Sequence, residues 1–582
     1  MDLFRACTGI RFGTLTLLVI CLSACGGGNS NGSPPPPPPA VPTISSFTAG
    51  PDNVTSGQSA TLTWQVSGAT SLQLSGISAT LSAPSSSIVV TPAATTTYTF
   101  TATNAAGSEQ KTATVSVTSA ASIASVQINP AAPTLPISAN FLSIGQEMED
   151  TQTMVGTSSS NMNPIYEQLL KNLNEYANGP LLIREYADGA SADVYGADFL
   201  SALSQLNKDT GAQFFVGVDF VDDVVATATG EAAELASGLP TGALQAIELG
   251  NEPDLYGNSG ARPSGWDYAD YLLDYQQFAA PLISASGGVK LSAPVWAGVS
   301  TKFMDNLDSF ISTEASTVGI VTVHHYSGTA CNGATEPGDY LLTEPAVDGD
   351  TQPLTGPVGI PSYLPAAQLA GIPFRIGELN SINCGGQAGV SNSFSSALWG
   401  MDISFSYANA GVSGVNFFSP GDVTTTHPYS PFDFTFTSNS NGTRTYSVRD
   451  INPLYYGLLL FAETVQNNAQ LLPVVLTTTA NIKTWATIDA NGTVRLLILN
   501  KDETASGPIS IALSGYGQAL VTRLAASSYT STTGVTLGGQ TFDGSPGGTP
   551  QGTAYQEVVV PASGSYTIAI PAVSAALVTI QQ

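Results

Sequence analysis

Between Phe141 and about residue 467, short apolar runs alternate with segments whose apolar residues recur every three to four positions. The apolar runs are Phe141–Ile144, Leu181–Arg184, Phe214–Val218, Ala246–Leu249, Val289–Leu291, Ile320–Val323, Phe374–Ile376 and Val415–Phe418. The first amphipathic segment carries Ile165, Leu169, Leu170, Leu173 and Tyr176 on one helical face. Strands that alternate with helices predict an α/β fold, here a (β/α)₈ TIM barrel. A doubly wound open sheet is the alternative, but no Gly-rich phosphate loop follows the first strand.

The pattern on either side of this region has a period of two. Residues 41–120 and 468–582 contain short alternating strands, such as 60–66 and 494–499, separated by turn residues. Two β-sandwiches are therefore expected, one before and one after the barrel. The first resembles bacterial immunoglobulin-like modules, and we expect it to act as a spacer.

The start of the chain reads as an export signal. Arg5 and Arg11 precede the apolar run 12–22, and Leu-Ser-Ala-Cys25 follows it directly. This order resembles the bacterial lipobox, so we expect a signal peptide at 1–24 and a lipidated Cys25. The lipid would anchor the protein to the membrane of the bacterial cell envelope, and Gly26 favours the outer membrane. An ordinary secretory signal is the alternative. A Gly/Ser/Pro-rich linker then occupies 25–40.

The composition of the chain limits which partners, metals and disulfides can be expected. The net charge is −27 with only sixteen Lys and Arg, which argues against a nucleic-acid partner. Three histidines make a multi-histidine metal site improbable, and no cofactor is expected. Two cysteines remain outside the signal region and the lipobox, Cys331 and Cys384. In an oxidising compartment they predict one disulfide.

Two glutamates occupy matching places in the predicted barrel. Glu252 follows the fourth strand in Leu-Gly-Asn-Glu-Pro, and Glu378 follows the seventh in Gly-Glu-Leu-Asn-Ser. Barrel active sites lie at the carboxyl ends of the strands, and glycoside cleavage needs two opposed carboxylates. A retaining mechanism predicts a separation of about 5–5.5 Å between them, and inversion about 6.5–9.5 Å. Two ordinary loop-end carboxylates are the structural alternative.

Two neighbouring strands offer groups that would hold a carboxylate ionised. The sixth strand ends in His324-His325-Tyr326, which places Tyr326 against Glu378, although a packed histidine pair is the alternative. Arg184 ends the second strand and would supply positive charge to the same carboxylate.

Together, Leu-Gly-Asn-Glu-Pro, His-His-Tyr and Gly-Glu-Leu-Asn-Ser-x-x-Cys-Gly-Gly resemble glycoside hydrolase family 79, which contains β-glucuronidases and heparanase. The resemblance covers residues 124–582 and implies a barrel at 124–467, whose first residues (124–136) join a C-terminal sandwich at 468–582. It implies that Glu252 is the acid/base, Glu378 the nucleophile and Asn251 a contact of the sugar 2-hydroxyl. A disulfide between Cys331 and Cys384 would brace the loop after the nucleophile.

The same resemblance implies how a uronate would be bound. Gly385 in the Cys-Gly-Gly loop and Tyr455 correspond to carboxylate-binding positions, with Tyr456 a near-equal choice. Asn383 stands where the family has a tyrosine, which puts glucuronate specificity in question. Glu147, with Glu149, is a candidate for distal hydroxyls. The expected function is a retaining exo-β-glucuronidase acting on a uronate-bearing glycan. The alternatives are an endo-acting heparanase-like enzyme, a neutral-sugar β-glycosidase and a non-catalytic carbohydrate-binding lipoprotein.

Overall fold

The fold is described from a computed structural model that describes residues 40–79, 81, 84–118, 121–176, 178–186, 196–298, 302–347, 359–421 and 426–582. The predicted signal peptide, Cys25 and the linker up to residue 39 lie outside the described residues. No helix in the described ranges is long and apolar enough to cross a membrane.

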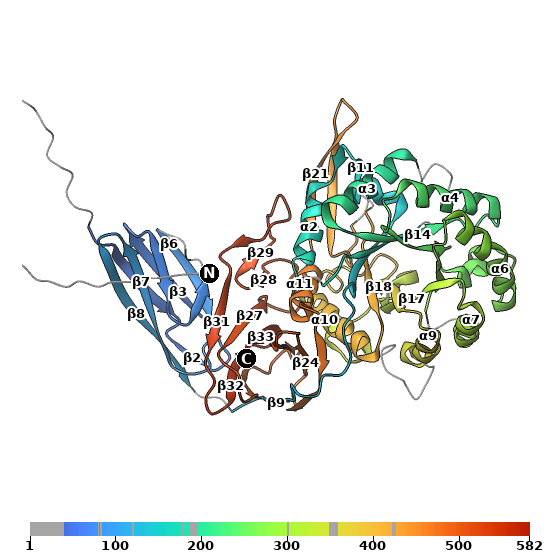
Figure 1. Cartoon of the computed structure of the whole chain (residues 1–582). Helices are drawn as coiled ribbons and strands as arrows, with labels where there is room; N and C mark the ends of the chain where they lie inside the picture. Colours follow the sequence, from blue (N-terminus) through green and yellow to red (C-terminus); the bar gives the residue numbers. More distant parts are fainter. Residues whose placement is uncertain are drawn as a thin grey trace, which may run out of the picture. The chain divides into compact units, whose positions relative to one another are not determined.

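Eight parallel strands close into a barrel in the order in which they occur along the chain (Figure 1). The last strand pairs with the first through Val415 and Leu142, which closes the ring. The strands are β10 (Leu142–Glu147), β13 (Leu182–Tyr186), β14 (Gln213–Val218), β15 (Leu244–Leu249), β16 (Leu291–Trp296), β17 (Val318–Thr329), β18 (Phe374–Asn383) and β19 (Gly414–Phe418). The predicted TIM barrel is confirmed.

Helices follow the barrel strands. They are α2 (Pro164–Asn174), α3 (Ala197–Thr210), α4 (Val225–Gly238), α6 (Tyr268–Ala285), α7 (Leu307–Glu314), α9 (Leu364–Ala370), α10 (Phe394–Ala410) and α11 (Pro453–Val465). Most turn an apolar side to the core, while α10 and α11 are buried on nearly every side. Local sequence sets where the helices begin. Asn163 caps α2 by accepting from the N–H groups of Ile165 and Tyr166, and Pro164 follows at the first helical position.

A β-sandwich follows the barrel. One sheet has the order β31 (Tyr555–Val559), β27 (Ala519–Ala525), β33 (Ser574–Ile580), β25 (Val494–Asn500), β24 (Ile482–Ile488) and β22 (Gln470–Leu472). The other has the order β23 (Val474–Thr478), β9 (Ala124–Ile128), β26 (Gly507–Ala512) and β32 (Ser565–Ile570). The segment before the barrel therefore supplies β9, a strand of the sandwich at the other end of the sequence.

The barrel and the C-terminal sandwich share one hydrophobic core. Leu497, Leu499 and Leu577 of the sandwich belong to the same buried cluster as the residues of α10 and α11. A fully buried ion pair crosses the junction, with Lys501 Nζ 2.7 Å from Asp402 Oδ2. Trp485 Nε1 donates to the other oxygen of Asp402 at 2.9 Å. The sandwich is thus fixed to the barrel, and pockets at their boundary are structural features of the molecule.

The N-terminal region consists of strands that pack around Trp64. The strands are β1 (Thr43–Gly50), β2 (Asn53–Thr55), β3 (Ala60–Ser67), β4 (Ser71–Leu74), β5 (Ile77–Ala79), β6 (Ser85–Val90), β7 (Thr96–Asn104) and β8 (Gly107–Thr118). Trp64 is buried and stacks on Phe100 with ring centroids 5.2 Å apart. Strand β5 pairs with β31 of the C-terminal sandwich.

Several strand boundaries differ from the sequence prediction, and those of β16, β17 and β18 differ most. Strand β16 begins at Leu291 and not at Val289, and it continues through Pro294, a residue that argues against a strand when only the sequence is read. Strands β17 and β18 run several residues further than expected, because their polar ends remain paired. His324 pairs with Glu378, and Tyr326 pairs with Asn380. The glutamate of the seventh strand is therefore part of that strand.

Candidate active site

Glu378 lies on β18 with both carboxylate oxygens engaged. Arg184 Nη1 donates to Oε2 at 2.6 Å, and the Tyr326 hydroxyl donates to Oε1 at 2.6 Å. The side chain is only 7% exposed. Charge-assisted bonds of this length stabilise the ionised carboxylate and hold its direction. Burial and the charge of Glu378 raise the pKa of Tyr326, so that its hydroxyl keeps the proton that it donates.

Arg184 comes from β13, which is separated from β18 by the two strands β10 and β19, and it is fully buried. Besides Glu378 it donates to Glu248 Oε1 from Nε at 2.8 Å and to Asn251 Oδ1 from Nη2 at 2.7 Å. Burial alone would lower the pKa of Arg184, but the carboxylates of Glu248 and Glu378 outweigh burial and raise it. Arg184 is therefore a permanent positive charge between the two strand ends that carry the glutamates.

Glu252 lies just beyond β15 in a different environment. Its backbone is left-handed, with φ of 47°, and its N–H donates to the carbonyl of Val295. This conformation is uncommon for a residue with a side chain and persists only where the surroundings enforce it. His324 Nδ1 lies 2.9 Å from Oε1, and the side chain is 27% exposed. A partly exposed carboxyl can exchange protons with a bound molecule or water, as an acid/base must.

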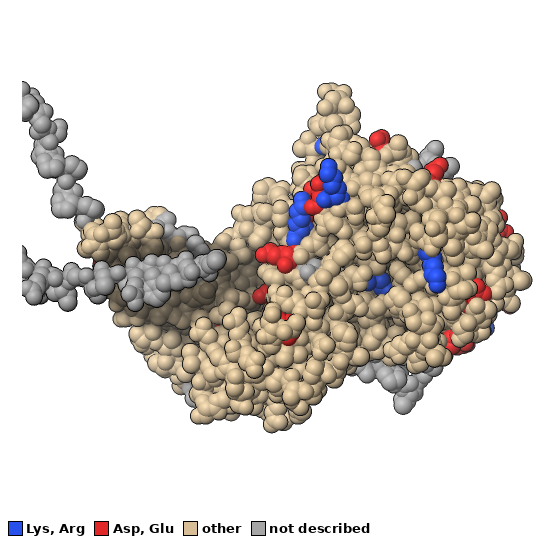
Figure 2. Space-filling view, in the orientation of Figure 1, with Lys and Arg blue, Asp and Glu red and all other residues tan. Residues whose placement is uncertain are grey.

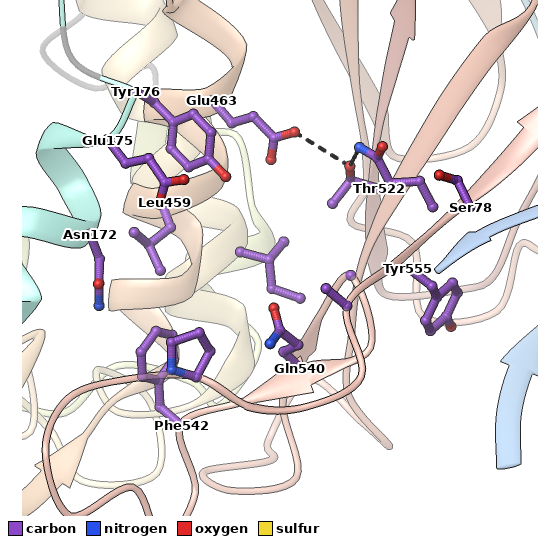
Figure 3. A pocket seen from close by; sticks show the side chains of 15 residues that line it. Ser78, Asn172, Glu175, Tyr176, Leu459, Glu463, Thr522, Gln540, Phe542 and Tyr555 are labelled. Carbon is purple, nitrogen blue, oxygen red and sulfur yellow. Dashed lines mark hydrogen bonds between the residues drawn. The ribbon is translucent and has the colours of Figure 1, made fainter. Parts of the chain in front are cut away.

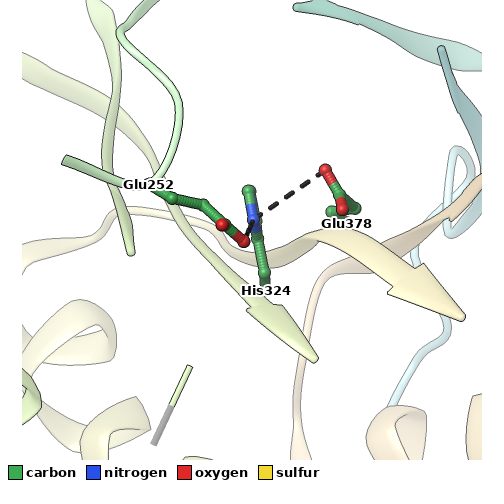
Figure 4. Close-up of side chains that lie close together, drawn as sticks. All are labelled: Glu252, His324 and Glu378. Atoms are coloured by element: carbon green, nitrogen blue, oxygen red, sulfur yellow. Dashed lines mark hydrogen bonds and ion pairs between the residues drawn. The ribbon is translucent and has the colours of Figure 1, made fainter. Parts of the chain in front are cut away.

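The two glutamates face each other across His324 (Figure 4). One ligand atom from each of Glu252, His324 and Glu378 can be chosen so that all three lie within 4.8 Å of one another. The carboxylate oxygens therefore approach within that distance, closer than the 6.5–9.5 Å of an inverting pair and in keeping with a retaining one. The three groups could also surround a cation, but the guanidinium of Arg184 already neutralises Glu378 and would repel it.

The His-His-Tyr segment divides its side chains between the two faces of β17. His324 and Tyr326 reach Glu252 and Glu378, whereas His325 packs edge-on against Tyr407 of α10. Alternate residues of a strand point to opposite faces, so the packed-histidine alternative applies to His325 alone.

The predicted disulfide between Cys331 and Cys384 is present and joins the segments after β17 and β18. Asn383, at the end of β18, lies with Oδ1 3.1 Å from Cys331 Sγ. A side chain placed on Gly385 would meet open space, so the backbone there is accessible. One placed on Gly386 would come within 2.8 Å of the Tyr429 backbone nitrogen. The glycines thus let the braced loop pack closely on Tyr429.

Aromatic residues form a wall beside Glu378. Tyr186, Phe418 and Tyr429 make a buried cluster against which Tyr326 packs. The hydroxyl of Tyr186 donates to Glu147 Oε1 at 2.7 Å, which places Glu147 at the edge of this wall. The charges of Glu378 and Glu147 add to burial in raising the pKa of Tyr429. Glu149, in the short helical turn after β10, has no placed contact with these groups.

Tyr455 does not lie at this site, and that prediction is wrong. It is buried on α11, where its hydroxyl donates to the carbonyl of Leu169 at 2.8 Å. The alternative Tyr456 is also buried, and its hydroxyl accepts from the N–H of Phe542 at 2.6 Å. Helix α11 is apolar on nearly every side because it is enclosed between the barrel and the C-terminal sandwich. Both tyrosines are therefore structural.

The structure adds residues to the site that sequence reasoning did not assign. Tyr429 lies in the segment after β19, Glu248 lies on β15 itself, His324 lies on β17 beside β18, and Tyr186 ends β13. An aromatic residue in a loop after a barrel strand is a signal for Tyr429. Strand-end position is the signal for Tyr186, while nothing in the sequence connects Glu248 to Arg184.

Residues 484–577 match the profile described as the glycosyl hydrolase family 79 C-terminal beta domain. The C-terminal sandwich thus resembles the C-terminal β domain of that family. A curated β-glucuronidase of Aspergillus niger is 32% identical over 191 residues, or 30% of this chain and 34% of that protein. A curated β-glucuronidase of Neurospora crassa is 23% identical over 346 residues, or 50% of this chain and 59% of that protein. The matched regions thus span about a third to three-fifths of these relatives.

Solved structures share the fold of the barrel and its C-terminal sandwich. A 4-O-α-L-rhamnosyl-β-D-glucuronidase from Fusarium oxysporum 12S superposes with a TM-score of 0.59 at 20% identity, covering 78% of this chain and 98% of that one. A family 51 α-L-arabinofuranosidase from Bifidobacterium longum has a TM-score of 0.54 at 13% identity, covering 79% and 100%. At these identities the likeness concerns the fold.

Proposed function

We propose that this protein is a retaining glycoside hydrolase of the β-glucuronidase type. The observation that carries the proposal is the opposed pair Glu252 and Glu378, at the ends of β15 and β18, with oxygens within 4.8 Å. The different partners of the two glutamates assign their roles. Glu378, fixed by two short donors, suits a nucleophile, and the more exposed Glu252 suits a general acid.

The reaction follows in two steps. A carboxylate oxygen of Glu378 attacks the anomeric carbon while Glu252 gives its proton to the departing glycosidic oxygen, so that a glycosyl ester forms and the aglycone leaves as an alcohol. Glu252, now ionised, takes a proton from water, and the resulting hydroxide displaces Glu378 from the same carbon. Arg184 and Tyr326 stabilise Glu378 as a leaving group, and Asn251, beside Glu252, binds the 2-hydroxyl.

Glucuronate as the substrate sugar is supported by the similarity to the two fungal β-glucuronidases. At the site itself, the loop of Gly385 and Gly386 packs on Tyr429, and together these groups offer backbone N–H groups and a hydroxyl to a carboxylate. Tyr429 takes the place that was predicted for Tyr455. Asn383 would add an amide donor, with a shorter reach than a tyrosine.

An assay with aryl β-glycosides tests this proposal. The assay compares a glucuronide, a glucoside, a galactoside and a xyloside that carry the same leaving group. The glucuronide is expected to give the highest kcat/KM. The first-formed sugar should keep the β configuration, as monitored by proton NMR. Turnover of a neutral sugar with an inert glucuronide would overturn the substrate, and a product of inverted configuration would overturn the mechanism.

An exo action on a lightly charged glycan is favoured over a heparanase-like action on sulfated chains. The sequence holds sixteen Lys and Arg, and on the face shown in Figure 2 they occur in small separate groups without a continuous basic stripe. A sulfated polymer would be attracted by such a stripe.

The cellular location belongs to the same proposal. The lipobox Leu-Ser-Ala-Cys25 supports a lipid anchor in the cell envelope, and residues 41–118 would then be an immunoglobulin-like spacer behind the linker. Cys25→Ser should release the protein from membranes into the soluble fraction. Membrane retention of that variant would contradict the anchor without affecting the glycosidase proposal.

A further inference from the structure

A second cavity, of about 480 Å³, lies between α2 and α11 on one side and the C-terminal sandwich on the other (Figure 3). Its volume falls within the range of about 300–1,000 Å³ that is usual for small-molecule sites. Glu175 and Tyr176, just after α2, and Glu463 near the end of α11 line the barrel side. Phe542 and Tyr555 line the sandwich side.

This cavity lies away from the barrel's catalytic mouth, which we define as the carboxyl ends of the strands. Tyr176 also borders a small neighbouring cavity with Phe141 and Leu181, which directly precede β10 and β13. These residues mark the amino ends of the strands. Catalytic residues of barrels gather at the opposite ends, so a ligand held here would not occupy the site of Glu252 and Glu378.

The lining combines ring faces with groups that bind hydroxyls. Thr522 Oγ1 accepts from Gln556 Nε2 at 2.8 Å and lies 3.5 Å from Glu463 Oε1, to which it donates. In Figure 3 the carboxyl of Glu463 and the ring of Tyr176 lie side by side on the barrel wall of the cavity. Burial raises the pKa of Glu463 to about 7, so this carboxyl can both donate and accept hydrogen bonds near neutral pH.

The charges of the lining determine which ligands it favours. Among the described residues around the cavity, the charged side chains are Glu175 and Glu463, and none is Lys or Arg. An anionic sugar would meet like charge without a partner. A neutral sugar instead offers an apolar C–H face to the aromatic rings and hydroxyls to the carboxyl, amide and hydroxyl groups.

We propose that this cavity is a non-catalytic binding site for a neutral oligosaccharide. A glycan with an acidic residue at the catalytic mouth and neutral residues elsewhere could thus be held by two separate sites on one molecule. A small organic cation is the ligand class that the same acids and rings would otherwise accept.

The test measures binding to the full-length chain carrying Glu378→Gln, so that no sugar is hydrolysed during the titration. Neutral β-linked gluco-, galacto- and xylo-oligosaccharides, from di- to hexasaccharides, are titrated by calorimetry and saturation-transfer NMR. At least one series is expected to bind. Adding Glu463→Gln or Tyr176→Ala should weaken that binding about ten-fold.

Controls separate local binding from folding. Glu234→Gln, which makes the same change on the exposed face of α4, should leave binding unchanged. Tyr176→Phe keeps the ring and removes the hydroxyl, and it replaces Tyr176→Ala if the alanine variant unfolds. Each cavity variant, made on the wild-type chain, should hydrolyse an aryl glucuronide at the wild-type rate, so failure of the catalytic proposal is detected separately.

Three outcomes would overturn the inference. One is that no neutral series binds. Another is that one binds with an affinity that Glu463→Gln and Tyr176 variants do not change. The third is that tetramethylammonium binds, that this binding is lost in the Glu463 and Tyr176 variants, and that neutral sugars do not bind.

Discussion

The catalytic mouth is built around Glu252 and Glu378, and the second cavity is lined by Glu175 and Glu463, yet the two places differ in what surrounds these acids. At the mouth, buried Arg184 contacts Glu378, and Tyr326 and His324 complete the contacts of the pair. At the cavity, Glu175 and Glu463 have no lining cation among the described residues. Two carboxyl groups alone therefore do not make a catalytic site. The groups that set their charge and direction do.

The two places also differ in how rigidly their carboxyl groups are held. Glu378 is held by donors at 2.6 Å on both oxygens, whereas the hydrogen bond placed on Glu463 is a long 3.5 Å contact from Thr522. A nucleophile must be pre-positioned within a fraction of an ångström, and a sugar-binding carboxyl need not be. We expect substitutions at the two places to differ by orders of magnitude in their effect on turnover.

Glu378→Gln should have the largest effect, a loss of about 10⁴-fold or more in kcat on an aryl glucuronide, because no covalent intermediate can form. Glu463→Gln makes the same chemical change at the other site and should leave kcat within about two-fold. Stopped-flow and steady-state rates measure both. A residual activity of Glu378→Gln above a tenth of wild type would remove the distinction between the two sites.

Glu252→Gln should lower kcat/KM by about 10²–10⁴-fold for substrates with a poor leaving group, since protonation of the glycosidic oxygen is lost. Activated aryl glucuronides, which need little protonation, should be affected far less in the first step. Azide should then rescue turnover and give a glycosyl azide of retained configuration. Equal losses for good and poor leaving groups would assign Glu252 a different role.

Tyr326→Phe should reduce kcat by about 10²-fold, because one of the two donors to Glu378 is removed while its ring contacts remain. The loss should appear in kcat more than in KM, since the hydroxyl contacts the nucleophile. Tyr407→Phe is the matched control, because Tyr407 lies on α10 and packs against His325 on the outer side of β17. A Tyr326→Phe enzyme with unchanged kcat would show that Arg184 alone suffices.

Replacing both Cys331 and Cys384 by serine should raise KM for a glucuronide several-fold and leave kcat less affected, because the loop of Gly385 is no longer braced. The disulfide spans 53 residues of sequence, and its loss should also lower unfolding stability by about 2–4 kcal/mol. Thermal unfolding and Michaelis kinetics measure the two effects. A fall in Tm with KM unchanged would limit the disulfide to a structural role.

Glu463→Gln should have the smallest effect, a change of about 1–4 °C in Tm that depends on pH. Burial raises the folded pKa of Glu463 from 4.5 to about 7, so its contribution to stability is fully present below about pH 4.5 and is lost as pH rises through about 7. The glutamine does not titrate. The variant should therefore gain on the wild type at about pH 8 and not at about pH 4. The same difference at both pH values would contradict this burial.

Local patterns in the sequence determined much of the architecture. Apolar runs alternating with amphipathic segments predict the barrel, because barrel strands bury both faces whereas outer helices such as α2 bury only one. The sequence also predicted Glu252 and Glu378 as a pair, because both follow predicted strands and the carboxyl ends of barrel strands meet at one mouth. Tyr326 and Arg184 follow from the same rule. The two cysteines outside the predicted signal region and lipobox predicted their own pairing, which the structure contains.

Only the tertiary structure decided which distant groups meet. Tyr429, and not Tyr455, reaches the wall beside Glu378, because a loop's path is set by what it packs against, while an apolar helix such as α11 is drawn into the core. Glu248 on β15 joins Arg184 on β13 across the intervening strand β14. The second cavity gathers residues from Ser78 to Gln556, and no periodicity in the sequence connects them. Sequence patterns report contacts within an element and its neighbours. Contacts between elements far apart in the chain arise from packing, which no local pattern records.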